Sequence, residues 1–154
     1  MRKIFLGLLV VSRVALGATF VIEGDTLSPV PKDVVTSVLG TLQNSLLDRD
    51  GNPCEFVGKS VNLKFSASST PDWIVTTSDA CSWGAYAAPI WVIYRSDAGY
   101  RVVLSDSAYD VTLGPTGNNG LRNIATASAS AGVQEEKLWK YDGTQYKLVC
   151  RDVQ

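Results

Sequence analysis

Histidine is absent from this chain of 154 residues, and its absence excludes several kinds of chemistry. Without an imidazole there is no Ser-His-Asp or Cys-His catalysis, no histidine general base and no histidine metal ligand. Three cysteines cannot complete a four-ligand structural zinc site without help from carboxylates. Basic and acidic residues are nearly balanced, at 14 and 15, which disfavours nucleic-acid binding. We therefore expect no metal, no cofactor and no nucleic-acid partner.

Long apolar runs are also scarce, and the one candidate lies at the N-terminus. A basic start at residues 1–3 precedes a mostly apolar run over residues 4–16, interrupted by Arg13, and the small residues Gly17 and Ala18 follow. This order is typical of a secretory signal peptide, which we place at residues 1–17, with cleavage after Gly17 or Ala18. The alternative is a membrane anchor, but the run falls short of the roughly 20 residues that span a bilayer. We expect a periplasmic or secreted protein without membrane contact.

Removal of residues 1–17 changes the charge of the chain. The segment holds three basic residues and no acids, so 11 basic and 15 acidic residues remain, a net charge of −4. Such mild acidity is compatible with a basic partner but specifies none.

The three cysteines have a different meaning in an exported chain. Cys54, Cys81 and Cys150 allow three single pairings, and an oxidising compartment favours one of them as a disulfide. The pairing of Cys54 with Cys81 closes the shortest loop and is preferred. The third thiol is expected either to be buried or to pair between chains. A catalytic cysteine is not expected, because no histidine is present to generate its thiolate.

The pattern of apolar residues predicts one helix followed by many short strands. Apolar side chains recur at three- and four-residue spacing over residues 32–47, which indicates a helix that ends at the polar stretch 48–53. Asp142-Gly143 between two alternating segments predicts a type I′ hairpin. The expected fold is α+β: one domain over residues 18–154, with an antiparallel sheet of about seven to eight strands and the helix packed on it. The eight expected strands cover residues 61–65, 72–77, 90–94, 100–104, 108–113, 121–126, 137–141 and 144–149, and residues 19–22 are a candidate edge strand.

Asp48, Asp50 and Gly51 together suggest a calcium loop. Alignment of Gly51 with position 6 of an EF-hand places Leu46 at position 1 and Val57 at position 12, where oxygen ligands are required. A turn that ends the helix is therefore the better interpretation.

The C-terminal third carries a resemblance to known proteins. The segments TGNNGLRNI, at 116–124, and LWKYDGTQY, at 138–146, are similar to a turn-and-hairpin pair in small exported bacterial proteins and to single blades of FG-GAP-like propeller repeats. Some of these proteins resemble periplasmic inhibitors or immunity proteins that block cell-wall-degrading enzymes, so the resemblance implies a protein partner, namely a hydrolase. Calcium-binding members carry acids where Asn118 and Asn119 stand, so no calcium is expected. A complete propeller is excluded by the length of the chain.

These observations favour a binding protein that is not an enzyme. We expect an inhibitor or immunity-type protein directed against a cell-wall-acting hydrolase; the alternatives are an envelope-associated structural module and a carbohydrate-binding protein. A carboxylate pair is the one catalytic device left, and none of Asp72, Asp79, Asp97, Asp106 and Asp110 lies in a motif that pairs it with another. Aromatic, charged and amide residues in expected loops are candidate partner contacts. These are Trp83, Tyr86, Asp97, Tyr100, Asn118, Asn119 and Arg122.

Overall fold

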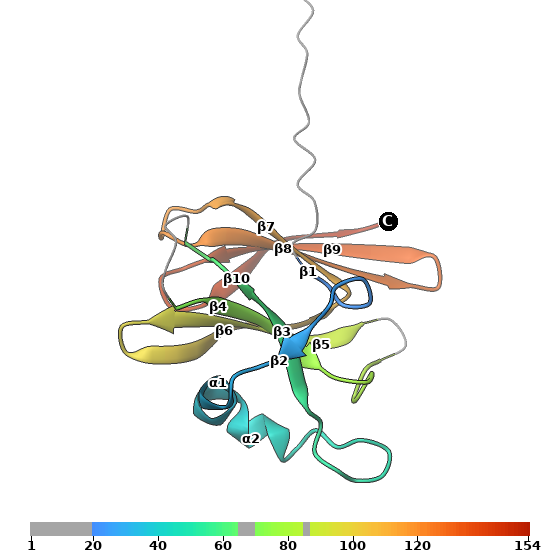
Figure 1. Ribbon diagram of the computed structural model, residues 1–154. Helices are drawn as coiled ribbons and strands as arrows, with labels where there is room; N and C mark the ends of the chain where they lie inside the picture. Colours follow the sequence, from blue (N-terminus) through green and yellow to red (C-terminus); the bar gives the residue numbers. More distant parts are fainter. Residues whose placement is uncertain (1–19, 65–69, 85–86) are drawn as a thin grey trace, which may run out of the picture.

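The protein folds as two antiparallel β-sheets packed against each other, with one short helix on the outside (Figure 1). The computed structural model describes residues 20–64, 70–84 and 87–154. Strands make up 55% of the structure and helix 9%, so the predicted α+β class with a single sheet is wrong. The expected signal peptide at residues 1–17 lies outside the described residues. No helix within the described ranges is both long enough and apolar enough to cross a membrane.

Each sheet has five strands, and the order along the chain differs from the order in space. The central sheet has the order β2-β3-β4-β5-β6, and the C-terminal sheet has the order β1-β7-β8-β9-β10. Only Tyr109 separates β6 from β7, so the chain passes from one sheet to the other at a corner without a loop. The central sheet contains β2 (Ser28–Pro29), β3 (Phe56–Val61), β4 (Asp72–Thr77), β5 (Ala88–Ser96) and β6 (Gly99–Ala108). The C-terminal sheet contains β1 (Phe20–Val21), β7 (Asp110–Thr116), β8 (Arg122–Ser130), β9 (Val133–Tyr141) and β10 (Tyr146–Val153).

The main core lies between the two sheets. Alternate residues of facing strands point inward, as the period of two in a strand requires. Ile74 and Ile90 of the central sheet and Val111 and Ile124 of the C-terminal sheet are all fully buried in one cluster. Burial of each such side chain stabilises the fold by about 1.5–3 kcal/mol.

A second core lies on the outer face of the central sheet, beneath the helix. The helix consists of α1 (Lys32–Val34), a π-helical turn (Val35–Leu39) and α2 (Gly40–Gln43), and its buried residues Val34 and Leu39 pack with Phe56, Trp91 and Ile93. Because helix and C-terminal sheet cover both faces of the central sheet, β5 is apolar at nearly every position. The helix ends at Gln43, earlier than the predicted residue 47.

Most strands are longer than expected, and two of the differences concern residues that are poor strand formers. The strand expected at residues 61–65 is instead β3 at Phe56–Val61, and residue 65 lies outside the described residues. A Cβ on Gly58 would lie 2.4 Å from the carbonyl oxygen of Ile74 on β4, so the close approach of these strands requires glycine. The small-residue segment after residue 126 was expected to be a loop. It extends β8 to Ser130, and Ala131 and Gly132 form the turn, with φ values of 45° and 88°.

The predicted type I′ hairpin is also corrected. A type I′ turn needs positive φ at both central residues, and of Asp142 and Gly143 only the glycine has it. Tyr141 pairs with Tyr146, so the loop has four residues, and the Asp142 carboxylate accepts hydrogen bonds from the backbone N–H groups of Thr144 and Gln145. These bonds hold the pKa of Asp142 below its ordinary value.

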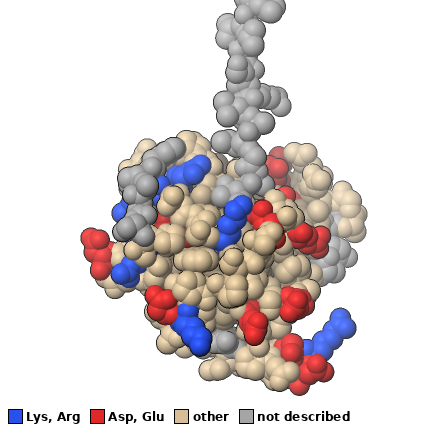
Figure 2. All heavy atoms as spheres, viewed as in Figure 1, with Lys and Arg blue, Asp and Glu red and all other residues tan. Residues whose placement is uncertain are grey.

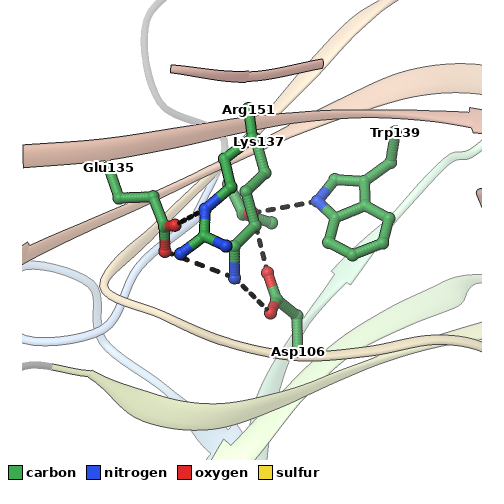
Figure 3. Close-up of polar contacts among 6 residues, drawn as sticks. Asp106, Glu135, Lys137, Trp139 and Arg151 are labelled. Carbon is green, nitrogen blue, oxygen red and sulfur yellow. Dashed lines mark hydrogen bonds and ion pairs between the residues drawn. The ribbon is translucent and has the colours of Figure 1, made fainter. Parts of the chain in front are cut away.

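Polar side chains of β6, β8 and β9 tie the two sheets together (Figure 3). Asp106 on β6 accepts hydrogen bonds from Lys137 of β9 at 2.8 Å and from the hydroxyl of Thr126 on β8 at 2.9 Å. Thr126 in turn accepts a hydrogen bond from the indole of Trp139, and Lys137 also lies 3.5 Å from a carboxylate oxygen of Glu135. Since Asp106 and Lys137 are mostly buried and each carboxylate oxygen of Asp106 accepts a hydrogen bond, this network fixes how the sheets meet.

A second polar contact between the two sheets involves Arg101, near the start of β6, and two tyrosine rings. The guanidinium of Arg101 lies over the rings of Tyr94 and Tyr141, at 5.6 and 5.9 Å from their centroids, and donates to the Tyr141 hydroxyl. Such cation–π contacts each contribute about 0.5–2 kcal/mol. The two sheets are therefore joined by polar contacts as well as by the apolar core.

Candidate functional site

The predicted disulfide between Cys54 and Cys81 is present, and both cysteines line a cleft. It joins the segment before β3 to the loop after β4, with 5.8 Å between the two Cα atoms. The cleft has a volume of about 970 Å³ and lies between residues 47–55 and residues 78–83. We call it the disulfide cleft.

The first wall of the disulfide cleft is a turn organised by one carboxylate. Asp48 accepts hydrogen bonds from the backbone N–H groups of Asp50 at 2.9 Å and Asn52 at 2.8 Å. These bonds lower the pKa of Asp48, with the N–H of Asn52 as the largest cause. The stretch forms a turn, but this turn does not end the helix as predicted, because the helix already ends at Gln43. Across the described ranges, no group of three or more potential ligand residues is placed to hold a metal ion.

The second wall is a loop in an unusual backbone conformation. Asp79, Ala80 and Ser82 have φ values of 49°, 54° and 59°, although none of them is glycine. A left-handed conformation costs such residues on the order of 1–2 kcal/mol each, so surrounding contacts must hold the loop in place. The contacts are the disulfide and the hydrogen bond from the backbone N–H of Ser78 to the Glu55 carbonyl, at 2.9 Å.

Trp83 is the last residue of this wall, and contacts with the protein interior hold its side chain in place. Its indole N–H donates to the hydroxyl of Thr77 at 3.0 Å, and its ring packs against the main core while part of it remains exposed in the cleft. The hydroxyl of Thr77 itself contacts the Cys81 carbonyl. Trp83 is thus a rigid aromatic surface beside the disulfide. Its predicted neighbour Tyr86 lies outside the described residues.

The lining of the disulfide cleft is acidic. Asp48, Asp50, Glu55 and Asp79 contribute four carboxylates, against the single guanidinium of Arg49. Figure 1 shows the 47–53 loop protruding at the bottom of the molecule, and Figure 2 shows acidic side chains gathered there with a basic side chain beside them. Charges of one sign around a hollow raise the local concentration of oppositely charged groups.

Asp97 and Tyr100, two of the predicted contact residues, lie far from the disulfide cleft. Asp97 lies in the turn between β5 and β6, and Tyr100 is the second residue of β6, where its ring lies under the guanidinium of Arg95 at 4.9 Å. Trp83 lies before the start of β5 and Asp97 follows its end, so the nine residues of this strand separate them by about 26 Å. The predicted residues therefore do not form one compact surface.

The remaining predicted residues lie in the loop between β7 and β8 and at the first position of β8. Arg122 donates to the carbonyls of Gly114 at 2.8 Å and Leu113 at 2.7 Å, so its guanidinium holds the loop closed. Asn119 donates to the carbonyl of Tyr141 at 2.8 Å, and Asn118 is exposed beside it in a small hollow of about 280 Å³. The two segments that carry the family resemblance thus lie together in the C-terminal sheet.

Two of the acids considered for a catalytic pair have structural partners instead. The carboxylate of Asp72 accepts hydrogen bonds from the backbone N–H groups of Leu63 and Arg95, each at 2.8 Å, and it is buried. Burial raises the pKa of Asp72 above its ordinary value despite these bonds. Both carboxylate oxygens of Asp106 are occupied by the tie between the sheets.

No protein-family model, curated protein or solved structure matches the chain. Its site must therefore be understood from its own geometry, as an acidic cleft built on a disulfide of a β-sandwich. The acids of the cleft were not among the predicted contact residues. Each acid lies within six residues of Cys54 or Cys81. Because the disulfide joins these two segments, the preferred pairing already implied that the acids lie close together in space.

Proposed function

We propose that this chain is a periplasmic or secreted binding protein without catalytic activity, and that the disulfide cleft is its contact surface. Its partner in this proposal is a cell-wall-acting hydrolase, which it inhibits or to which it confers immunity. The observation that carries the proposal is a large acidic cleft with both walls held in place. The resemblance of segments 116–124 and 138–146 to periplasmic inhibitors points in the same direction.

Rigidity supports a role in tight binding. Association is weakened by every loop that must be ordered on contact, and loops ordered beforehand avoid that cost. In the disulfide cleft, Asp48 orders one wall, and the disulfide and Thr77 order the other. A protruding, preordered loop next to an exposed aromatic side chain is typical of a protein inhibitor.

Charge supports a basic partner. Enzymes that act on anionic cell-wall polymers bind them with cationic groups, and an acidic cleft is complementary to the same groups. Arg49 is the one cation in the lining, so attraction outweighs repulsion for such a surface. The disulfide is compatible with the oxidising compartment in which such enzymes work.

The test measures inhibition of purified cell-wall hydrolases, namely a muramidase, an amidase and an endopeptidase, by the turbidity of a peptidoglycan suspension. We expect dose-dependent inhibition of at least one enzyme, weakened about ten-fold or more by Asp50→Lys combined with Glu55→Lys. The control combines Glu23→Lys with Glu136→Lys, which changes the net charge equally at exposed residues outside the cleft. Equal inhibition by both double variants, or no inhibition of any enzyme, would contradict the proposal.

Trp83 favours one alternative, the binding of carbohydrate. A tryptophan ring fixed in a cleft can stack on a sugar ring, and the indole N–H of Trp83 is already engaged behind it. Titration with soluble peptidoglycan fragments, followed by tryptophan fluorescence, separates the two functions. Binding of fragments that is lost in Trp83→Phe but kept in the Asp50→Lys/Glu55→Lys variant would favour carbohydrate recognition over a basic protein partner.

A further inference from the structure

The strand β10 is an open edge of the C-terminal sheet. The sheet order ends at β10, and no strand within the described ranges pairs with its other side. Leu148, Val149 and Val153 are exposed to 47%, 54% and 56%, which is unusual for apolar side chains on a strand. An unpaired edge with apolar side chains is a template for pairing with another strand.

The backbone of the second half of β10 directs hydrogen-bonding groups outward. Gln134 and Gln154 exchange two backbone hydrogen bonds, each of 2.9 Å, and so form a hydrogen-bonded pair. Residues of an antiparallel strand alternate between facing one neighbour and facing the other. Counting back along β10 from Gln154, the N–H and C=O of Val153 and Arg151 therefore face the open edge.

The first half of β10 directs a second set of groups outward. The N–H of Asp142 donates to the carbonyl of Gln145 at 3.0 Å, which establishes that these residues face each other across the hairpin. By the same alternation, Tyr146 and Leu148 direct their N–H and C=O toward the open edge. A bulge at Val149, between Leu148 and Cys150, shifts the pattern by one residue between the two halves.

Four residues of β10 direct their backbone groups toward the open edge. Only one antiparallel register of two β10 strands places each of them opposite another such residue of the second copy. In that register Leu148 of one copy lies opposite Arg151 of the other, and Tyr146 lies opposite Val153. Every other register leaves at least one outward residue without an outward residue opposite it. The bulge is the cause, because it separates the two outward sets by an odd number of residues.

The same register brings opposite charges together. Lys147 of one copy lies directly opposite Asp152 of the other, and two-fold symmetry repeats the pair. Lys147 pairs with Lys140 inside the sheet and Asp152 pairs with Glu136, and all four lie on the outer, exposed face. Directly opposite residues that are not hydrogen-bonded approach most closely, so this pairing is favourable.

We propose that a second copy of this chain binds along β10, antiparallel and two-fold symmetric, in this register. The two C-terminal sheets then form one continuous sheet of ten strands. The backbone pairs supply the attraction, and Lys147 with Asp152 selects the register. This proposal does not depend on the function of the disulfide cleft, which lies on the other sheet.

Sedimentation equilibrium of the chain, expressed with residues 1–17 so that it is exported, tests the proposal. We expect a dimer whose dissociation constant rises about ten-fold or more in either Lys147→Glu or Asp152→Lys, because each change places like charges opposite each other twice. The combined Lys147→Glu/Asp152→Lys variant restores opposite charges and should restore the dimer. Lys140→Glu and Glu136→Lys alter the same face one strand inward and should leave the dimer unchanged.

Two further measurements keep the proposal testable if a charge variant folds poorly. Val153→Pro removes an N–H that faces the edge rather than β9, so it should keep the fold, followed by circular dichroism, and abolish the dimer. In the proposed register the two Cys150 Cα atoms are about 6 Å apart. A bis-maleimide with a two-carbon spacer should therefore link the copies through this exposed thiol. A monomer at all concentrations, failure of the charge swap to restore the dimer, or equal loss in the β9 controls would overturn the proposal.

Discussion

Removal of the Cys54–Cys81 disulfide should destabilise the protein by about 3 kcal/mol. The two cysteines are 27 residues apart, and the entropy lost by an unfolded loop of that length corresponds to about 3.5 kcal/mol. Part of this is offset, because the left-handed residues Asp79, Ala80 and Ser82 can relax once the bridge is gone. The relaxation stays incomplete, since the N–H of Ser78 still bonds to Glu55.

The assay is equilibrium unfolding in urea, followed by circular dichroism, of the Cys54→Ser/Cys81→Ser variant against the wild-type chain. Cys150→Ser is the matched control, because it removes the exposed free thiol by the same substitution and should change the free energy of unfolding by less than about 0.5 kcal/mol. Both measurements are made at protein concentrations low enough for the monomer to dominate.

The same variant should loosen the walls of the disulfide cleft. Limited proteolysis is expected to cut within residues 47–55 or 78–83 before any strand is cut, since these loops lose their covalent link. A destabilisation below about 1 kcal/mol, with cleavage unchanged, would refute the reasoning. It would mean that the hydrogen bonds of Thr77 and Ser78 hold the loop without the disulfide.

Two further predictions concern the packing and the charge of the fold. Gly58→Ala should destabilise the protein by about 2 kcal/mol or more in urea unfolding, because its Cβ meets the backbone of β4. Gly40→Ala, on the helix with no contact closer than 3.7 Å, should instead stabilise it by about 0.5–1 kcal/mol, and equal effects would contradict this contrast. Burial raises the folded-state pKa of Asp72, so this residue stabilises the fold at low pH and its contribution is lost as the pH rises above 3.8. The unfolding free energy of the wild type minus that of Asp72→Asn should therefore increase as the pH falls from 7 toward 4. A decrease over the same range would contradict this sign.

Local signals predicted most strands, while their division between sheets could not be predicted. The segment 72–77 coincides with β4, and the apolar run at 90–94 lies within β5. Alternation and β-forming residues indicate that a strand exists, but they do not say which strand it pairs with. The corner at Tyr109 is invisible in the sequence, because the strand pattern continues through it while the chain changes sheets.

The strand preferences of individual residues gave wrong predictions where contacts with neighbouring strands determined the structure. The β3 strand contains Gly58, Lys59 and Ser60, which are poor strand formers, yet the approach of β4 selects a strand with a glycine at the crossing. Similarly, the strand expected at residues 121–126 stops before the next alanines, although β8 continues through them to Ser130.

The candidate site was predictable only in part. Loop length favoured the Cys54–Cys81 pairing, and Trp83 follows the second cysteine by two residues. The acids of the cleft carry no motif, because their proximity depends on the disulfide rather than on spacing. Arg122 shows the reverse case: its residue type suggested a contact with a partner, but two carbonyls of the neighbouring strand β7 engage its guanidinium.

The two proposed surfaces can act together because they belong to different sheets. The disulfide cleft lies at β3 and β4 of the central sheet, and β10 lies at the far edge of the C-terminal sheet. A dimer joined through β10 would therefore leave both clefts open. Two clefts held at a fixed separation bind a surface that carries repeated partners more tightly than one cleft does. Dimerisation would thus strengthen the retention of the protein at a surface with many hydrolase molecules without any change in the cleft.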